Sequence, residues 1–187
     1  MENVHQRKKE PELIRQKILE HAMQLAAQKG VSGVSIQAVA DFAGVTKGGV
    51  FHHYSSKQKL LDAMVREVLS RLDLAVDDYM QHDQGGYGCF TRAYIYFTLQ
   101  TENDGIGRFW SAISMTMLTD HAFNALWLDW LNGRLAQHQQ TDSGMELQLL
   151  RYAADGVWLN VFACSGDIAE MQRMKQELIQ RSYVQSA

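Results

Sequence analysis

The segment from Val34 to Leu61, VSIQAVADFAGVTKGGVFHHYSSKQKLL, constrains the fold more than any other part of the chain. Its first half predicts a short helix over residues 36–42. Ser35 is typical of the N-cap of such a helix, because its hydroxyl can accept a backbone N–H that has no partner within the helix. Gly44 follows in a tight turn, where the end of a helix often requires a positive φ.

The second half of this segment predicts two more helix starts. Thr46 is suited to cap a short helix over residues 47–53, and Ser55 and Ser56 offer caps for a long helix that begins at Lys57. Two short helices joined by a glycine-containing turn are the signature of a helix-turn-helix, whose second helix enters the major groove of DNA. The segment therefore predicts a DNA-binding regulator.

Apolar residues recur at helical spacing through the rest of the chain, and its one proline, Pro11, falls at the start of a helical pattern. In that first helix the apolar stripe includes Leu13 and Ile14. The predicted helices outside the helix-turn-helix cover residues 11–29, 57–80, 89–100, 106–120, 121–139, 145–163 and 167–181. We expect an all-α fold of about nine helices, with a three-helix DNA-binding domain over 1–56 and a second helical domain over 57–187.

The net charge of −3 is divided unevenly along the 187 residues. Residues 1–60 hold nine Lys/Arg and five Asp/Glu, which gives +4, whereas residues 61–187 hold nine Lys/Arg and sixteen Asp/Glu, which gives −7. A basic first third is suited to DNA phosphates, although uneven surface charge alone would give the same numbers.

The sequence gives little support for other classes of protein, such as membrane proteins, secreted proteins or enzymes. No apolar run has the length of a membrane span and no signal peptide is evident, so we expect a cytoplasmic protein with reduced cysteines at 89 and 164. Cys89 is the most conspicuous nucleophile candidate, and Arg92 is its one basic neighbour. No residue spacing predicts a catalytic site, a phosphate-binding loop or a metal site, and we expect no enzyme activity, no cofactor and no metal.

Residues 12–65 resemble the TetR family of one-component transcriptional regulators. The resemblance is carried, in order, by Ser35, Val39-Ala40, Ala43-Gly44-Val45, Thr46-Lys47-Gly48, Phe51-His52-His53-Tyr54, Ser56-Lys57 and Leu60-Leu61. Two positions depart from the family pattern. Phe51 stands where a tyrosine is usual, which removes a hydroxyl that could bind phosphate, and Gly49 stands where serine, threonine or alanine is usual.

The resemblance implies a set of DNA-binding residues. The candidates for base or groove contact are Gln37, Lys47, Gly48 and His52. The candidates for contact with the DNA backbone, or for support of the contacting residues, are Ser35, Thr46, Phe51, His53, Tyr54 and Lys57. Phe51 and Tyr54 are equally suited to core packing. His52 and His53 are neighbours on one helix and so point in different directions, which disfavours a metal site.

The resemblance also implies a homodimer through the last two helices and a pocket for a small molecule. Aromatic and methionine side chains would line that pocket, and a carboxylate among them would favour a flat cationic ligand. The candidate pocket residues are Glu102, Asp104, Phe109, Trp110, Met115, Phe123, Trp127, Asp155 and Trp158. For most of the apolar residues in this set the core is the better interpretation, and Asp155 is equally suited to a pairing at the dimer interface.

We therefore expect a dimeric repressor that binds a palindromic operator in double-stranded DNA and that a small hydrophobic ligand releases, with no membrane partner. Two alternatives remain open at this point. The chain could be an activator of the same family, or a helical adaptor that uses the first domain to bind protein.

Overall fold

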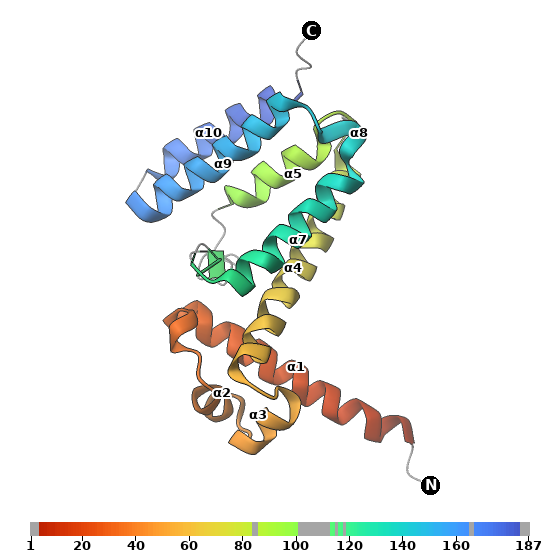
Figure 1. The fold of residues 1–187 in the computed structure, drawn as a ribbon, viewed down its shortest axis with the longest axis vertical. Helices are drawn as coiled ribbons and strands as arrows, with labels where there is room; N and C mark the ends of the chain where they lie inside the picture. The colour runs from red at the N-terminus through yellow and green to blue at the C-terminus, as the bar shows by residue number, and fades with distance from the viewer. Residues whose placement is uncertain are drawn as a thin grey trace. The chain divides into compact units, whose positions relative to one another are not determined.

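The computed structural model describes the backbone of residues 4–83, 86–100, 113–114, 116–117, 119–164 and 167–183, and the side chains of these residues except 4–10 and 162–164. This part of the chain holds nine α-helices, one 3₁₀ turn and no strand (Figure 1), which confirms the predicted all-α fold. The helices are α1 (Val4–Lys29), α2 (Ile36–Ala43), α3 (Lys47–His53), α4 (Lys57–His82), α5 (Cys89–Thr98), α7 (His121–Gln137), α8 (Gln139–Asp142), α9 (Met145–Cys164) and α10 (Ile168–Arg181).

The chain divides into two compact units. The first unit comprises residues 1–69 and 103–127, and the second comprises residues 70–102 and 128–187. The helices α4 and α7 each contribute residues to both units. The domain boundary predicted at residues 56 and 57 stays a prediction.

The helix-turn-helix in the first unit packs on α1, which contacts both α2 and α3. From Pro11 onward the first buried side chain of α1 is that of Ile18, and the buried side chains of the helix-turn-helix include Val39 and Val50. Leu13 and Ile14, which the sequence pattern placed on the apolar stripe of α1, are 63% and 40% exposed. A 26-residue helix is about 39 Å long, and α2 and α3 are too short to cover all of it. The helix also begins at Val4, so Pro11 lies inside it rather than at its start.

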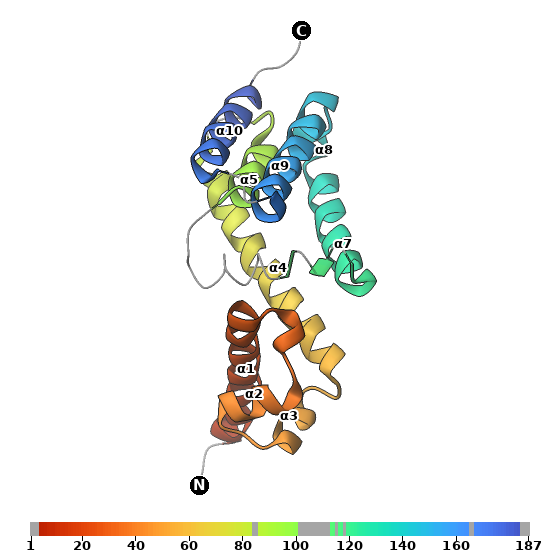
Figure 2. The same cartoon turned by 90° about the vertical axis from the view of Figure 1, so that its left-hand side faces the viewer.

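In the second unit α5 lies between other helices and contacts α8, α9 and α10 (Figure 2). One apolar core cluster of this unit consists of Ile95, Leu99, Ala154, Met171 and Leu178, which are buried together. The sequence pattern missed the four-residue helix α8, because so short a helix has no apolar period of its own.

Buried polar side chains fix the start of α5. The Arg92 side chain is fully buried, and its guanidinium donates to both carboxylate oxygens of Asp83 at 2.5 and 2.9 Å. It also donates to the carbonyl oxygens of Tyr87 at 2.8 Å and of Ser182 at 3.3 Å. Arg92 therefore ties the segment after α4 and the end of α10 to α5. We refer to Arg92, Asp83, Tyr87 and Ser182 as the Arg92 cluster.

Asp142 provides the cap at the same end of α5. Its carboxylate accepts the backbone N–H of Thr91 at 2.7 Å and the Thr91 hydroxyl at 2.6 Å. Gly88 directly precedes the helix with a φ of 72°, and a Cβ there would lie 2.6 Å from the carbonyl oxygen of Ser182. Only glycine fits this position, because both its backbone conformation and the approach of α10 exclude a side chain.

Candidate DNA-binding site and effector region

The helix-turn-helix is built by the caps and the turn that the sequence predicted. The Ser35 hydroxyl accepts the backbone N–H of Ala38 at 3.1 Å, which caps α2. Gly44 ends α2 in the left-handed region, with φ 67° and ψ 35°. The Thr46 hydroxyl accepts the backbone N–H of Gly49 at 3.0 Å and so caps α3. Local side-chain chemistry therefore sets where both helices begin and end.

The helix α3 buries one side and exposes the other. Val50 is fully buried and anchors the helix, whereas Lys47, Gly48 and His52 are exposed and Phe51 is 42% exposed. This is the arrangement that a recognition helix needs, because donors and bare backbone face outward. Lys57, at the start of α4, is exposed as well, and His53 is partly buried.

Gly49 has a local reason to be glycine. A Cβ at this position would lie 3.3 Å from the Thr46 hydroxyl oxygen, which is closer than most side chains approach such an atom. An alanine here would therefore crowd the cap of α3. The departure from the family pattern therefore accompanies the particular geometry of this cap.

Tyr54 lies in the core of the first unit, with 4% of its surface exposed. Its hydroxyl donates to the carbonyl oxygen of Arg15 at 3.3 Å, and the Arg15 guanidinium lies 5.5 Å from the ring centroid. Burial raises the pKa of this hydroxyl. Tyr54 therefore joins the end of α3 to α1 within the core, and its role in DNA binding stays a prediction.

Gln37 is exposed on α2 and is held by a neighbour that the sequence analysis passed over. Its side-chain amide donates to Asp41 at 2.8 Å, one helical turn further along. One amide hydrogen and the amide oxygen of Gln37 remain to face DNA. The spacing of four residues between Gln37 and Asp41 is the signal that could have revealed this pair.

The predicted effector region lies partly outside the described residues, which exclude Glu102, Asp104, Phe109, Trp110 and Met115. The remaining candidates fall in different units. In the first unit, Phe123 is 1% exposed and Trp127 is partly buried. In the second unit, Trp158 packs against the apolar core beside Ala154.

Asp155, the fourth described candidate, faces α5. The hydroxyl of Tyr94 donates to its carboxylate at 2.6 Å. Burial raises the pKa of Asp155, and the hydrogen bond from Tyr94 only partly opposes this shift. Burial and the adjacent carboxylate raise the pKa of Tyr94 in turn. Sequence reasoning did not find Tyr94, because 61 residues separate it from Asp155 and no local pattern links them.

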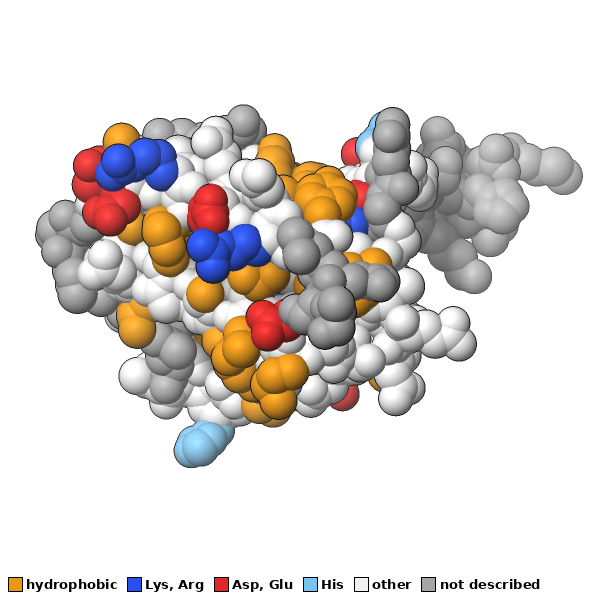
Figure 3. Space-filling model, turned by 90° about the horizontal axis from the view of Figure 1, so that it is seen from above, with side chains coloured by type: hydrophobic (Ala, Val, Ile, Leu, Met, Phe, Trp, Pro, Cys, Tyr) orange, Lys and Arg blue, Asp and Glu red, His pale blue; other side chains and the backbone are white. Residues whose placement is uncertain are grey.

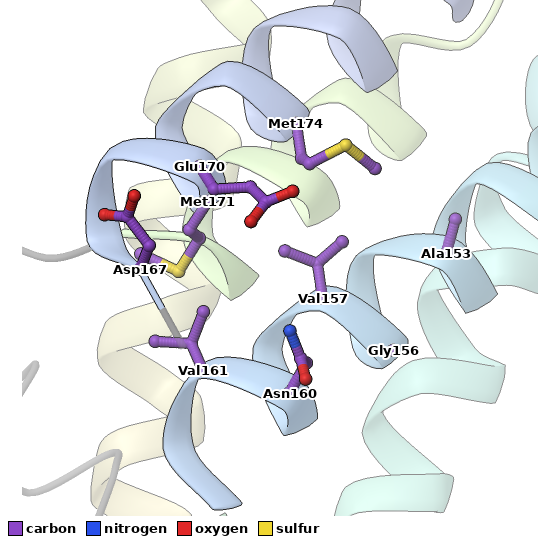
Figure 4. A pocket seen from close by; sticks show the side chains of 9 residues that line it. All are labelled: Ala153, Gly156, Val157, Asn160, Val161, Asp167, Glu170, Met171 and Met174. Atoms are coloured by element: carbon purple, nitrogen blue, oxygen red, sulfur yellow. The ribbon is translucent and has the colours of Figure 1, made fainter. Parts of the chain in front are cut away.

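The outer faces of α9 and α10 expose large apolar side chains. On α9, Met145, Leu149 and Tyr152 are 67%, 52% and 61% exposed, and on α10 Ile168 is 58% exposed. A groove of about 300 Å³ lies between the two helices. Figure 4 shows that Val157 of α9 and Glu170 of α10 point into the space between the helices. Its walls are formed by Ala153, Gly156, Val157, Asn160, Val161, Asp167, Glu170, Met171 and Met174.

Exposed apolar side chains also occur beyond this groove. On the face seen from above, apolar side chains lie between acidic and basic ones (Figure 3). Single exposed apolar residues are normal, and the faces of α9 and α10 differ because several such residues lie together.

The structure offers no sign of other chemistry among the residues it describes. In this part of the chain no group of three or more His, Cys, Asp or Glu side chains is placed to hold a metal ion. No helix in the same residues is long and apolar enough to cross a membrane. Burial raises the pKa of the Cys89 thiol, and the nearby Asp83 raises it further, which disfavours the reactive thiolate.

Two family models match the chain. Residues 18–64 match the bacterial regulatory proteins of the tetR family. Residues 88–183 match the tetracyclin repressor-like C-terminal domain, and this match alone covers more than half of the chain. The first match includes the helix-turn-helix, and the second includes α5, α7, α8, α9 and α10.

The curated relatives include several transcriptional repressors. The HTH-type transcriptional repressor AcnR of Corynebacterium efficiens is 28% identical over 144 residues, which cover 76% of this chain and 67% of that protein. AcnR of Corynebacterium glutamicum is 27% identical over 116 residues, which cover 62% of this chain and 56% of that protein. KstR2 of Mycobacterium tuberculosis is 33% identical over 58 residues, which cover 31% of this chain and 29% of that protein.

Solved structures share the fold. The multidrug binding protein EbrR in complex with malachite green has a TM-score of 0.70 and 20% identity, and the match covers 91% of this chain and 98% of that chain. A TetR-family member from Streptomyces coelicolor has a TM-score of 0.69 and 19% identity, over 91% of this chain and 99% of that chain. With a helix-turn-helix of the expected geometry and two family models that match in sequence, this chain belongs to the TetR family of bacterial transcriptional regulators.

Proposed function

We propose that the chain is a dimeric repressor that binds a palindromic operator and leaves it when a small hydrophobic, cationic molecule binds the second unit. Its family membership makes the chain a DNA-binding regulator rather than an enzyme. The observation that carries the proposal is the exposed face of α3, which presents Lys47, Gly48 and His52 on a helix anchored by Val50. Binding to chromosomal DNA would take place in the cytoplasm, which is the localisation we propose.

On DNA, α3 would lie in the major groove. Gln37, Lys47, Gly48 and His52 would contact bases or the groove, because amide, ammonium and imidazole donors match the acceptors on base edges. Residues around them would contact the DNA backbone or support these contacts. The supporting set is Ser35, Thr46, Phe51, His53, Tyr54 and Lys57.

Two copies of the chain would be needed for specific binding. One bidentate side-chain contact to a base discriminates by about 1–3 kcal/mol, so a single recognition helix reads too few bases to find one operator. A two-fold symmetric dimer doubles the contacts and matches a palindrome. The exposed apolar faces of α9 and α10 support a dimer through these two helices.

A ligand in the second unit would reach the DNA-binding helices through α4, which has residues in both units. A ligand that binds one conformation better than the other shifts the population toward it. Among the described residues of the second unit, Asp155 and Trp158 are the ligand contacts we propose. A carboxylate near an aromatic ring suits a flat cation, and EbrR has been solved with malachite green and with ethidium.

Operator binding is tested by a gel-shift titration with the DNA upstream of the chain's own gene, at two salt concentrations. The variant Lys47→Ala should weaken binding at least about tenfold, because it removes a charged donor from each recognition helix. Lys57→Ala, from the set proposed to contact the DNA backbone, should reduce the slope of log K against log salt by about 1.8 for the two copies of a dimer, at about 0.9 per phosphate contact.

The matched control is Lys29→Ala, which removes the same charge from the end of α1 and should leave both quantities almost unchanged. No binding to this DNA, but tight binding to another sequence found by random-sequence selection, would place the operator elsewhere. No binding to any DNA would overturn the proposal and favour the adaptor.

Ligand binding is tested with ethidium as the probe, followed by its fluorescence. The variant Asp155→Asn should weaken binding relative to Asp129→Asn, which removes a carboxylate from an exposed position on α7. Equal affinities for the two variants would exclude Asp155 as the counter-charge.

A further inference from the structure

The outer face of α9 carries an exposed apolar stripe that runs nearly the length of the helix. Met145, Leu149, Tyr152 and Leu159 lie within one narrow arc of the helix, and each is at least 44% exposed. Gly156 lies in the same arc, between Tyr152 and Leu159, and it also forms part of the wall of the groove between α9 and α10. The stripe and the groove therefore meet at Gly156.

The chain itself gives no reason for a glycine at position 156. The residue lies in the middle of α9, where glycine costs about 1 kcal/mol relative to alanine. Its φ is not positive, since the positive-φ glycines of the described chain are Gly30, Gly44 and Gly88. A Cβ at this position would meet no atom within 4 Å. Neither the backbone nor the packing of α9 within one chain requires the missing side chain.

We infer that two copies of the chain associate face to face with their α9 helices crossing at Gly156. Two helices approach most closely where their crossing point lacks side chains, which gives this glycine a use. The inference rests on the dimer in the proposed function and adds the residue at which the two copies meet.

A second copy of the chain is the partner that this surface fits best, because the same face carries both protruding side chains and a groove that could hold them. Large side chains such as Tyr152 and Leu159 stand on the same face as a groove of about 300 Å³, far more than the roughly 30 Å³ of one water molecule. In a two-fold interface the same patch is used by both partners, so it must be self-complementary. Side chains of each copy can then enter the groove of the other.

The charges of α10 agree with two-fold pairing. Asp167 and Glu170 lie at its start and border the groove, whereas the exposed Arg173 lies further along the helix. A two-fold axis across this face would place two copies of α10 in opposite directions. The acidic start of each helix would then approach the basic part of the other.

Disulfide cross-linking in the full-length chain tests the crossing point directly. In a background in which Cys89 and Cys164 are replaced by serine, Gly156→Cys should form a disulfide-linked dimer under mild oxidation. Two cysteines can be bridged only when their Cα atoms lie within about 7 Å, so the bond reports the crossing itself. The control is Gly133→Cys, at an exposed position in the middle of α7 where a Cβ also meets no atom within 4 Å, and it should not cross-link.

Dimer affinity gives an independent readout through alanine variants, measured by sedimentation over a dilution series. Gly156→Ala should weaken dimerisation at least tenfold, because two methyl groups are forced together where the helices cross. Gly133→Ala adds the same methyl group to an open helical position and should leave the dimer affinity within twofold of the original chain.

The outcomes separate the inference from the function on which it rests. A dimer that neither cross-links through Gly156→Cys nor weakens with Gly156→Ala would overturn the crossing point and leave the dimeric repressor intact. Preferential cross-linking by Asn160→Cys would overturn it too, and would move the crossing one turn along α9. A chain that stays monomeric at tens of micromolar would overturn both the inference and the proposed dimer.

Discussion

Loss of the carboxylate of Asp83 should destabilise the second unit more than any surface substitution. The side chains of Asp83 and Arg92 are 2% and 0% exposed, and two hydrogen bonds of 2.5 and 2.9 Å join them. Burial alone lowers the pKa of Arg92, but the hydrogen bond and the charge of Asp83 outweigh this effect and leave the pKa raised. The arginine is therefore a buried cation whose charge is paired with the carboxylate of Asp83.

The variant Asp83→Ala removes the counter-charge and leaves the cation in place. Arg92 would keep the carbonyl oxygens of Tyr87 and Ser182, and the ring of Tyr183 at 3.9 Å from its Cζ, but would lose the carboxylate that forms its buried ion pair. Removing one partner of a buried ion pair costs about 3–5 kcal/mol. We expect a loss of this size in the free energy of unfolding of the second unit.

The exposed pair of Arg181 and Glu177 on α10 provides the matched control. Its separation is 2.7 Å, close to that of the buried pair, but the two side chains are 68% and 51% exposed. Exposed ion pairs contribute about 0–1 kcal/mol, because water screens them and ordering two long side chains costs entropy. The variant Glu177→Ala should therefore change the free energy of unfolding by less than about 1 kcal/mol.

Urea denaturation of both variants measures the difference, at one fixed protein concentration because dimerisation adds to the apparent stability. Far-UV circular dichroism follows the helices, and binding to operator DNA reports whether the first unit remains folded. If Asp83→Ala lowers the free energy of unfolding no more than Glu177→Ala does, then burial of the Asp83–Arg92 pair does not determine how much the pair stabilises the second unit, and the reasoning fails.

Three further substitutions test other parts of the structure. Gly44→Ala should destabilise the helix-turn-helix by about 1–2 kcal/mol in urea denaturation, because alanine disfavours the left-handed backbone, and an unchanged midpoint would contradict this. Asp155→Asn should flatten the pH dependence of the free energy of unfolding. Because the pKa of Asp155 is raised in the folded state, the original chain loses stability as the pH rises above about 4 and through that pKa. Parallel pH profiles for the two proteins would exclude a contribution from Asp155. Asp41→Ala should free the Gln37 amide and so reduce discrimination between operator variants, while non-specific DNA binding stays unchanged or rises. Equal weakening of binding to all operator variants and to non-specific DNA would argue against this role of Asp41.

The sequence predicted the helix-turn-helix closely because its geometry depends on neighbouring residues. Ser35 and Thr46 each cap a helix by accepting an N–H three residues ahead, and Gly44 supplies a backbone conformation that few residues adopt. These interactions can be identified from adjacent letters of the sequence. The bounds of α3 were therefore predicted correctly, and those of α2 to within one residue.

The interior of the second unit could not be predicted in the same way. Its fixed points join residues far apart in the chain, such as Asp142 with Thr91, 51 positions apart, and Arg92 with Ser182, 90 positions apart. No periodicity encodes such pairs. From the sequence, Arg92 was only the basic neighbour of Cys89, whereas in the structure it is a fully buried ion-pair partner.

The same limit applies to burial along α1. The apolar spacing of Leu13 and Ile14 predicted a core position, but a helix extends its periodic pattern beyond the elements that cover it. Spacing identifies which face of a helix is apolar. It does not show how far along the helix a partner reaches, which depends on the lengths of α2 and α3.

The acidic surplus of the second part of the chain has a use that charge counting does not reveal. Arg134 of α7 forms ion pairs with Asp73 and Asp77 on α4, at 3.0 and 2.6 Å, and Arg92 of α5 pairs with Asp83 just after α4. Both arginines are buried or nearly so, and each would be costly without its carboxylates. The acidic side chains at this end of α4 and just after it therefore hold α5 and α7 against α4. They also keep the second part of the chain acidic, so that the positive charge lies mainly in the part with the helix-turn-helix. A movement of α5 or α7 must then either carry this end of α4 along or break an ion pair of an arginine that is itself buried or nearly so.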